Sequence, residues 1–160
     1  MELKDTKLFK LLQNLEEKEF GEKLYPISGN ITTHLLPVSE KLLASIPAYM
    51  PEFTLHDKNH CIKIIEIIGD LLPPEVDLNI IELMILVHSV FLHDIGMVVN
   101  KDDALAMKAT KDFQKLYYEY DKATPDDEIL TEFIRRTHVT RSLEYVDKFK
   151  KSIDIYGIIP

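Results

Sequence analysis

Apolar residues recur along this chain at intervals of three and four, the spacing that places them on one face of an α-helix. In the first such segment, about residues 2–24, Leu8, Leu11, Leu12 and Leu15 are separated mainly by charged and polar residues. The strict alternation typical of a strand is nowhere sustained in the sequence. The pattern therefore predicts an all-α protein with a bundle of about six helices.

Proline and glycine positions indicate where these helices end, because both residues interrupt regular structure. Gly29 and Asn30 are expected to lie in a loop, and Pro73-Pro74 is expected to end a helix. The helices that we predict after the first one are a short one at about 38–46, one from Thr54 to Leu72, one capped by Asp77 and ending near Gly96, an amphipathic one around 113–120, and a long one from Pro125 to about Lys150.

The same signals divide the chain into three parts. Residues 1–50 are predicted to be a helical extension that packs on the core, and residues 51–150 are predicted to be the core that carries the candidate chemistry. Residues 151–160 end in an apolar stretch without a charged finish, and we interpret them as a tail or as the start of a following domain. On this interpretation, the sequence is an N-terminal fragment of a longer protein.

The composition of the chain excludes several classes of protein and makes some partners unexpected. The chain has 160 residues, 46% of them hydrophobic and 29% charged, which is the balance of one globular domain. Its net charge of -8 makes nucleic acid and an anionic membrane surface unexpected partners. The single cysteine, Cys61, excludes a disulfide framework and a cysteine-rich zinc site. The amino terminus lacks an apolar signal core, and we expect a cytoplasmic protein with no membrane partner.

The helix predicted from Thr54 carries His56 and His60. At about 100° per residue, His60 lies a quarter-turn from the polar stripe of this helix and thus at the rim of the buried face, where a ligand lining a cleft would lie. His56 is expected one turn earlier and closer to solvent. Thr54 and Asp57 also match a capping box, which gives Asp57 a purely structural role.

The next predicted helix is apolar almost all round and ends in His93-Asp94. A carboxylate placed at the end of such a helix is costly unless it is paired or bound to a metal. Gly96 permits a break after this pair, so that both side chains can reach one cation. The alternative is a helix cap with a core histidine. For His88, on another face of the same helix, a hydrogen-bonded core histidine is the preferred interpretation.

His138 lies on the half-apolar face of the last helix, between Arg135 and Arg141. An imidazole flanked by two guanidinium groups suits a phosphate, because arginine offers forked donors to oxyanions. The alternative is that these arginines pair with surface acids. Together, His60, His93, Asp94 and His138 offer nitrogen and oxygen ligands without a thiolate, which suits a divalent ion such as Mn, Mg, Fe, Co or Zn.

Three stretches resemble a known family. These are Phe53-Thr-Leu-His-Asp-Lys-Asn-His60, Leu86-Val-His-Ser-Val-Phe-Leu-His-Asp-Ile-Gly96 and Ile134-Arg-Arg-Thr-His-Val-Thr-Arg-Ser142. The first two are similar to the HD-domain metal-dependent phosphohydrolase superfamily, whose hallmark is a histidine, an adjacent His-Asp pair and a later aspartate. The third resembles the Arg-x-x-His-x-x-Arg-Ser block of the HD-CE subfamily. That subfamily often precedes an ATPase of the heat-shock-protein type, so an ATPase-type domain is a possible partner.

The resemblance implies a phosphohydrolase that acts on a nucleotide or a related phosphoester. It implies that His60, His93 and Asp94 bind the metal, and that His138 is a further ligand or faces the substrate with Arg135 and Arg141. His56 resembles a proton-donating histidine, so His56 and Asp94 are the expected catalytic residues.

The closing aspartate of the family has no clear match, since Asp147 lies on the opposite helix face and Asp154 lies in the tail. A degenerate module that binds a nucleotide or regulates an attached ATPase-type domain is therefore the alternative. A helical adaptor without a site is a third possibility.

Overall fold

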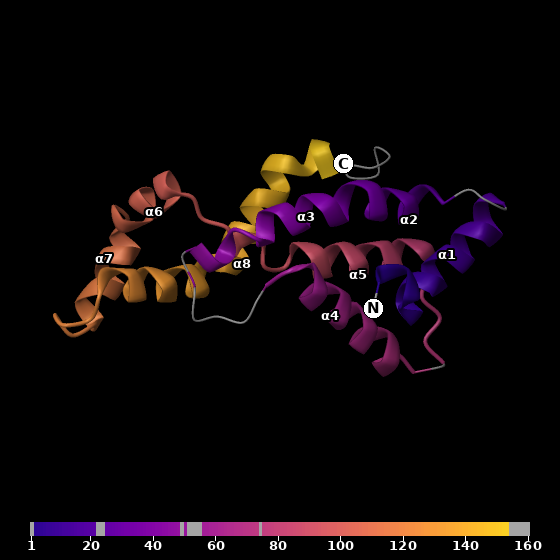
Figure 1. Cartoon of the computed structure of the whole chain (residues 1–160), viewed down its shortest axis with the longest axis horizontal. Helices are drawn as coiled ribbons and strands as arrows, with labels where there is room; N and C mark the ends of the chain where they lie inside the picture. Colours follow the sequence, from indigo (N-terminus) through magenta and orange to yellow (C-terminus); the bar gives the residue numbers. More distant parts are fainter. Residues whose placement is uncertain (1, 22–24, 49, 51–55, 74, 154–160) are drawn as a thin grey trace.

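The computed structural model describes residues 2–21, 25–48, 50, 56–73 and 75–153. These residues form helices and no strand, which confirms the predicted all-α class (Figure 1). The α-helices are α1 (Lys7–Phe20), α2 (Pro26–Asn30), α3 (Leu36–Leu43), α4 (Lys58–Leu71), α5 (Ile80–Leu92), α6 (Lys101–Lys108), α7 (Lys111–Glu119) and α8 (Asp126–Ile153). Short 3-10 turns are η1 (Leu3–Asp5), η3 (Ile46–Ala48) and η4 (Ile95–Met97), and η2 (Ile31–Leu35) is a π-helical turn.

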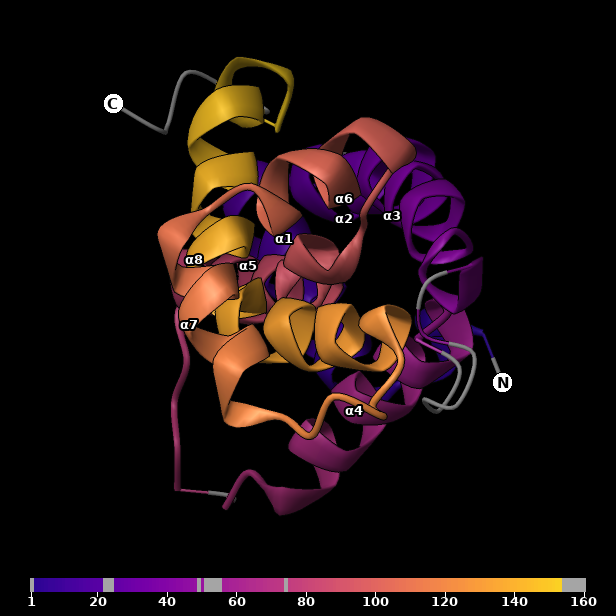
Figure 2. The same cartoon turned by 90° about the vertical axis from the view of Figure 1, so that its left-hand side faces the viewer.

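Helix α5 is the central element of the main bundle. It packs against α1, α3, α4 and η2, while α6, α7 and the first half of α8 form a second group at one end of the molecule (Figures 1 and 2). Helix α8 then packs mainly on η4, the short turn that follows α5. The long last helix thus reaches the part of the chain that carries the His-Asp pair.

The prediction of a loop at Gly29 and Asn30 is wrong, because both residues lie in α2. Helix α2, η2 and α3 continue into one another, and buried Ile27 and Ile31 hold this rod against the core. Its π-helical turn, with a bond from the Leu36 N–H to the Ile31 carbonyl, precedes Pro37. A proline cannot donate a backbone hydrogen bond and crowds the carbonyl four residues back, so a widened turn accommodates it within the rod.

A buried carboxylate joins α1 to the start of this rod. The Glu16 side chain has no exposed surface and accepts hydrogen bonds from the backbone N–H groups of Ile27 and Ser28. The first N–H groups of a helix have no partner within it, so the carboxylate satisfies them at the favourable end of the helix dipole. Buried side chains from both sides of residue 50 form one hydrophobic cluster. The division of the chain into three parts stays a prediction.

Helix α5 begins two residues later than expected. Asn79, not Asp77, caps it, accepting from the N–H groups of Ile81 and Glu82, while Glu82 completes a capping box. In the described part of the chain, Ile80–Met97 is the one stretch that could cross a membrane by length and composition. A core helix passes the same test, and α5 packs on three other helices.

One helix and one helix end also differ from the sequence prediction. Helix α6 was not expected, and the first part of the predicted tail, residues 151–153, continues α8. Thr54, the expected start of α4, lies outside the described residues, as do residues 154–160.

Candidate metal centre

Asp94 lies where α5 gives way to η4. The helix ends at Leu92, and Asp94 leaves helical geometry with φ of -99° and ψ of 2°. Its side chain is only 6% exposed. The backbone break therefore turns a carboxylate into the protein at the end of an apolar helix, as the sequence predicted for this residue.

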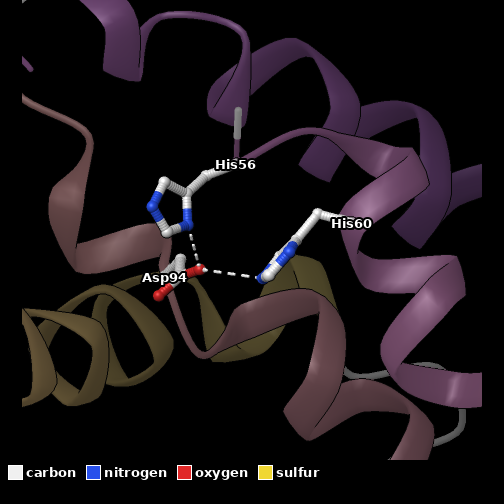
Figure 3. A group of neighbouring side chains, drawn as sticks. All are labelled: His56, His60 and Asp94. Carbon is white, nitrogen blue, oxygen red and sulfur yellow. Dashed lines mark hydrogen bonds and ion pairs between the residues drawn. The ribbon is translucent and has the colours of Figure 1, made fainter. Parts of the chain in front are cut away.

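Three imidazoles meet a single oxygen of this carboxylate. Asp94 Oδ2 lies 2.7 Å from His56 Nδ1 and 3.9 Å from His60 Nε2, two side chains that point toward it in Figure 3. His93 Nε2 lies 2.7 Å from the same oxygen. Residues 56, 60 and 93–94, distant in sequence, are thus brought together around one atom.

The start of α4 sets the positions of both histidines on that side. Asp57, itself in extended conformation, caps the helix by accepting from the His60 N–H at 2.9 Å, which places His60 in the first turn and His56 directly before the cap residue. Asp57 has a structural role, but the predicted position is wrong, because Asp57 is itself the cap of a helix that begins at Lys58 and is not the third residue of a capping box that begins at Thr54. The expectation that His56 lies closer to solvent is wrong, because its side chain is 12% exposed and that of His60 is 34% exposed.

Burial and charge act against each other in this cluster. Burial works to raise the pKa of Asp94, but hydrogen bonds and charges from His93 and His56 outweigh it and hold that pKa below its usual value. The hydrogen bond to Asp94 raises the pKa of His93 despite burial. Burial lowers the pKa of His60, outweighing the attraction of Asp94. The carboxylate is therefore kept ionised, which is the form that binds a cation.

His93 is oriented from its other nitrogen. The Val90 carbonyl can only accept, so His93 Nδ1 donates to it at 2.7 Å and Nε2 is directed toward Asp94. A backbone carbonyl on the far ring nitrogen is the usual way in which a metal-ligating histidine is held. His88, by contrast, donates from Nδ1 to the Met84 carbonyl, as expected for a hydrogen-bonded core histidine.

The geometry of the cluster fits a metal ion. Ligand atoms of His56, His60 and Asp94 all lie within 4.8 Å of one another. Neighbouring ligands of an ion with bonds of about 2.1 Å are roughly 3 Å apart, a separation that the observed 2.7 and 3.9 Å bracket. In addition, His56 Nε2 is buried and has no hydrogen-bond partner, an arrangement that costs energy unless something else meets that nitrogen.

The predicted residues of the last helix lie differently. His138 is not a member of the compact group, and its Nδ1 donates to the Arg135 carbonyl at 2.6 Å. Arg135 donates through Nε and Nη2 to the two carboxylate oxygens of Glu132. This is the alternative in which the arginine pairs with a surface acid and not with a phosphate. The Arg141 side chain donates to the Gly96 and Val98 carbonyls. The structure thus brings His60 and His93 to the Asp94 carboxylate, whereas the compact group of His56, His60 and Asp94 includes neither His93 nor His138.

The closing aspartate has no counterpart among the described residues. Asp147 is exposed on α8 and is not in the group, and Asp154 lies outside the described residues. Asp94 is accordingly the one carboxylate of the group.

Residues 50–159 match the model of a known family. The model described as HD-CE matches residues 50–159, which is well over half of the chain. The chain belongs to the HD-CE family. No curated protein and no solved structure matches it. The stretch matched in this HD-CE protein contains the three histidines around Asp94 and the whole of α8.

Sequence reasoning missed two features of the site. It did not place His56 against Asp94, because His56 precedes α4 and helical periodicity does not reach it. It also did not foresee that Ser142 contacts the turn at His93–Val98, where its hydroxyl lies between the His93 carbonyl and the Gly96 N–H. The only signal for the second was that Ser142 ends the Arg-x-x-His-x-x-Arg-Ser block.

Proposed function

We propose that this HD-CE protein is a metal-dependent phosphohydrolase that acts on a nucleotide or a related phosphoester. The observation that supports this proposal is the arrangement of three imidazole nitrogens within 3.9 Å of one buried carboxylate oxygen. A structural role alone gives a poor account of it, because three titratable rings are brought to one atom at the end of an apolar helix.

We assign His60, His93 and Asp94 as the residues that would hold the ion, and we assign a separate role to His56, which forms the compact group with His60 and Asp94. Imidazole ligands suit Zn or Fe, and carboxylate and water ligands suit Mn or Mg, so a mixed set of histidines and one aspartate is compatible with either kind of ion. A divalent ion, when bound, activates a water molecule and polarises the phosphoryl oxygen.

His56 is the residue that we assign to proton transfer. Hydrolysis joins a water oxygen to phosphorus and breaks the bond to the leaving oxygen, which must then receive a proton. His56 contacts Asp94 through Nδ1 and so lies beside the residues that would hold the ion, where an imidazole could supply that proton. Imidazole is the side chain that most often serves as a general acid or base.

One observation favours a second candidate function. The described group contains a single carboxylate, whereas the family pattern ends in a further aspartate. A catalytically degenerate module that binds a nucleotide, or that regulates an attached ATPase-type domain, would tolerate this difference. For either function we propose a cytoplasmic setting, which is compatible with the lone buried thiol of Cys61.

The proposal is tested by measuring phosphate or nucleoside release from a panel of nucleotides with added Mn²⁺. We expect turnover by the unaltered protein, its loss in Asp94→Asn, and little change in Asp147→Asn, which removes an exposed carboxylate from α8. His56→Ala is expected to lower kcat while Mn²⁺ still binds. Mn²⁺ binding without turnover would favour the degenerate module, and turnover that survives in Asp94→Asn would contradict the proposed site.

A further inference from the structure

The turn that follows Asp94 is closed by a serine from α8. Ser142 Oγ accepts a hydrogen bond from the Gly96 N–H at 2.9 Å and donates one to the His93 carbonyl at 2.9 Å. The Ser142 residue is 8% exposed, so water competes little for either bond. One hydroxyl therefore ties the backbone on both sides of Asp94.

An arginine beside it holds the rest of the turn. Arg141 Nε donates to the Gly96 carbonyl at 2.7 Å, and Arg141 Nη2 donates to the Val98 carbonyl at 2.8 Å. The planar guanidinium group fixes the spacing of these two carbonyls, which a lysine ammonium group cannot do. Residues 93, 96 and 98 thus all bond through their backbones to the side chains of Arg141 and Ser142.

The backbones approach too closely for the turn to shift by itself. A Cβ atom added at Gly96 would lie 1.9 Å from the His138 carbonyl oxygen and 2.6 Å from the Ser142 nitrogen. Helix α8 therefore lies directly on the turn at Gly96. Because α5 ends at Leu92, the backbone that carries Asp94 has no regular helix of its own to hold it.

We propose that Ser142 and Arg141 are positioning residues, which hold the His93–Gly96 backbone so that the Asp94 carboxylate stays in place between His56 and His60. The inference rests on the proposed metal-binding function. On this proposal, the Arg141 side chain holds backbone carbonyl groups of the turn and does not bind the phosphate that was expected from the sequence. Groups that orient metal ligands from outside typically change metal affinity by about 10–100-fold when they are removed.

The test is the Kd for Mn²⁺, measured by titration calorimetry on the full chain at a temperature where circular dichroism shows each variant folded. We expect Ser142→Ala and Arg141→Ala each to weaken Mn²⁺ binding about tenfold. Thr140→Ala, which removes an exposed hydroxyl from the same helix, is the control for the first, and Arg136→Ala, which removes an exposed guanidinium group, is the control for the second. Both controls should bind Mn²⁺ within about twofold of the unaltered protein.

The sign of the Arg141 effect separates positioning from simple electrostatics. Removing a positive charge by itself favours a cation, so weaker binding in Arg141→Ala must come from the lost hydrogen bonds. Arg141→Lys keeps the charge but loses the fork, and it should also bind Mn²⁺ more weakly. If the unaltered protein binds Mn²⁺ and all three variants match it within twofold, the positioning role is wrong while the metal site stands. If the unaltered protein binds no Mn²⁺, the proposed function fails, and the positioning role fails with it.

Discussion

Gly96 is a residue at which the His93–Val98 turn and α8 lie in direct backbone contact. Gly96→Ala should destabilise the protein by about 3 kcal/mol, because the new methyl group would meet backbone atoms that cannot move aside independently. The measurement is the free energy of unfolding from urea titration.

Gly29→Ala is the matched control for that substitution. Gly29 lies within α2, and a Cβ added there would meet nothing within 4 Å. Alanine is the better helix former, so this variant should be neutral or up to about 1 kcal/mol more stable. Equal effects at the two positions would contradict the close approach of α8 to the turn.

Single residues of the site were predictable to the extent that helical geometry determines them. The face of each helix predicted that His60 and the His93-Asp94 pair lie toward the protein interior. It could not place His138, since periodicity gives the face of a residue and not the direction of its ring. The pairing of Arg135 with Glu132 was visible at a spacing of three residues, but competing partners for an arginine are numerous in an acidic chain.

At the scale of elements, the start of α5 depends on its cap. Asn79→Ala should lower the free energy of unfolding by about 1 kcal/mol, because the side chain satisfies the N–H groups of Ile81 and Glu82. Asp77→Ala, two residues earlier and exposed, should have little effect. A larger loss in Asp77→Ala than in Asn79→Ala would show that the helix begins where the sequence first suggested.

The junction between α1 and α2 depends on Glu16. Glu16→Gln should cost about 2 kcal/mol, because the buried carboxylate accepts from two backbone donors and an amide offers one acceptor oxygen in its place. Glu17→Gln, an exposed neighbour on the same helix, is the control. The measurement is again urea unfolding, and equal stabilities of the two variants would contradict the capping role.

Elements were predicted well where one periodic pattern covers them and poorly where local signals conflict with packing. The all-α class and the long helices followed from apolar spacing. The rod from Pro26 to Leu43 did not, because Gly29, Asn30 and Pro37 all suggest interruption. Burial of Ile27, Ile31 and Leu35 against the core overrides these weak propensities, and that burial is a property of the assembled fold.

At the scale of the whole molecule, one carboxylate gives stability a defined pH dependence. Hydrogen bonds from Arg135 lower the pKa of Glu132 from 4.5 to about 2. Partial burial acts in the opposite direction, and a hydrogen bond from Arg136 adds to the lowering. A carboxyl with a lower pKa in the folded state adds stability above its unfolded pKa, and this contribution is lost as the pH falls toward 2. Glu132→Gln should therefore be less stable than the unaltered protein at pH 6, with the difference shrinking between pH 4.5 and pH 2.

Urea unfolding at a series of pH values tests this dependence. Glu144→Gln, which neutralises an exposed carboxylate elsewhere on α8, is the control. A Glu132→Gln difference that stays constant from pH 6 to pH 2.5 would contradict the ion pairing seen at the start of α8.

The whole-molecule arrangement was the least predictable part. The sequence indicated that several helices contribute to one site, but it did not show that α8 crosses the turn after Asp94. That crossing depends on Gly96 at one position and on Ser142 far along the chain, a juxtaposition that local periodicity does not contain. The contacts of α8 with this turn are therefore evident only in the packed structure.

The central claim is that the His-Asp cluster surrounds a divalent cation. The most direct test is an anomalous difference map from crystals of the protein grown with Mn²⁺. The account predicts one strong peak at a bonding distance, about 2.2 Å, from both Asp94 Oδ2 and His60 Nε2. A map without a peak at these atoms, with the manganese elsewhere or absent, would contradict it.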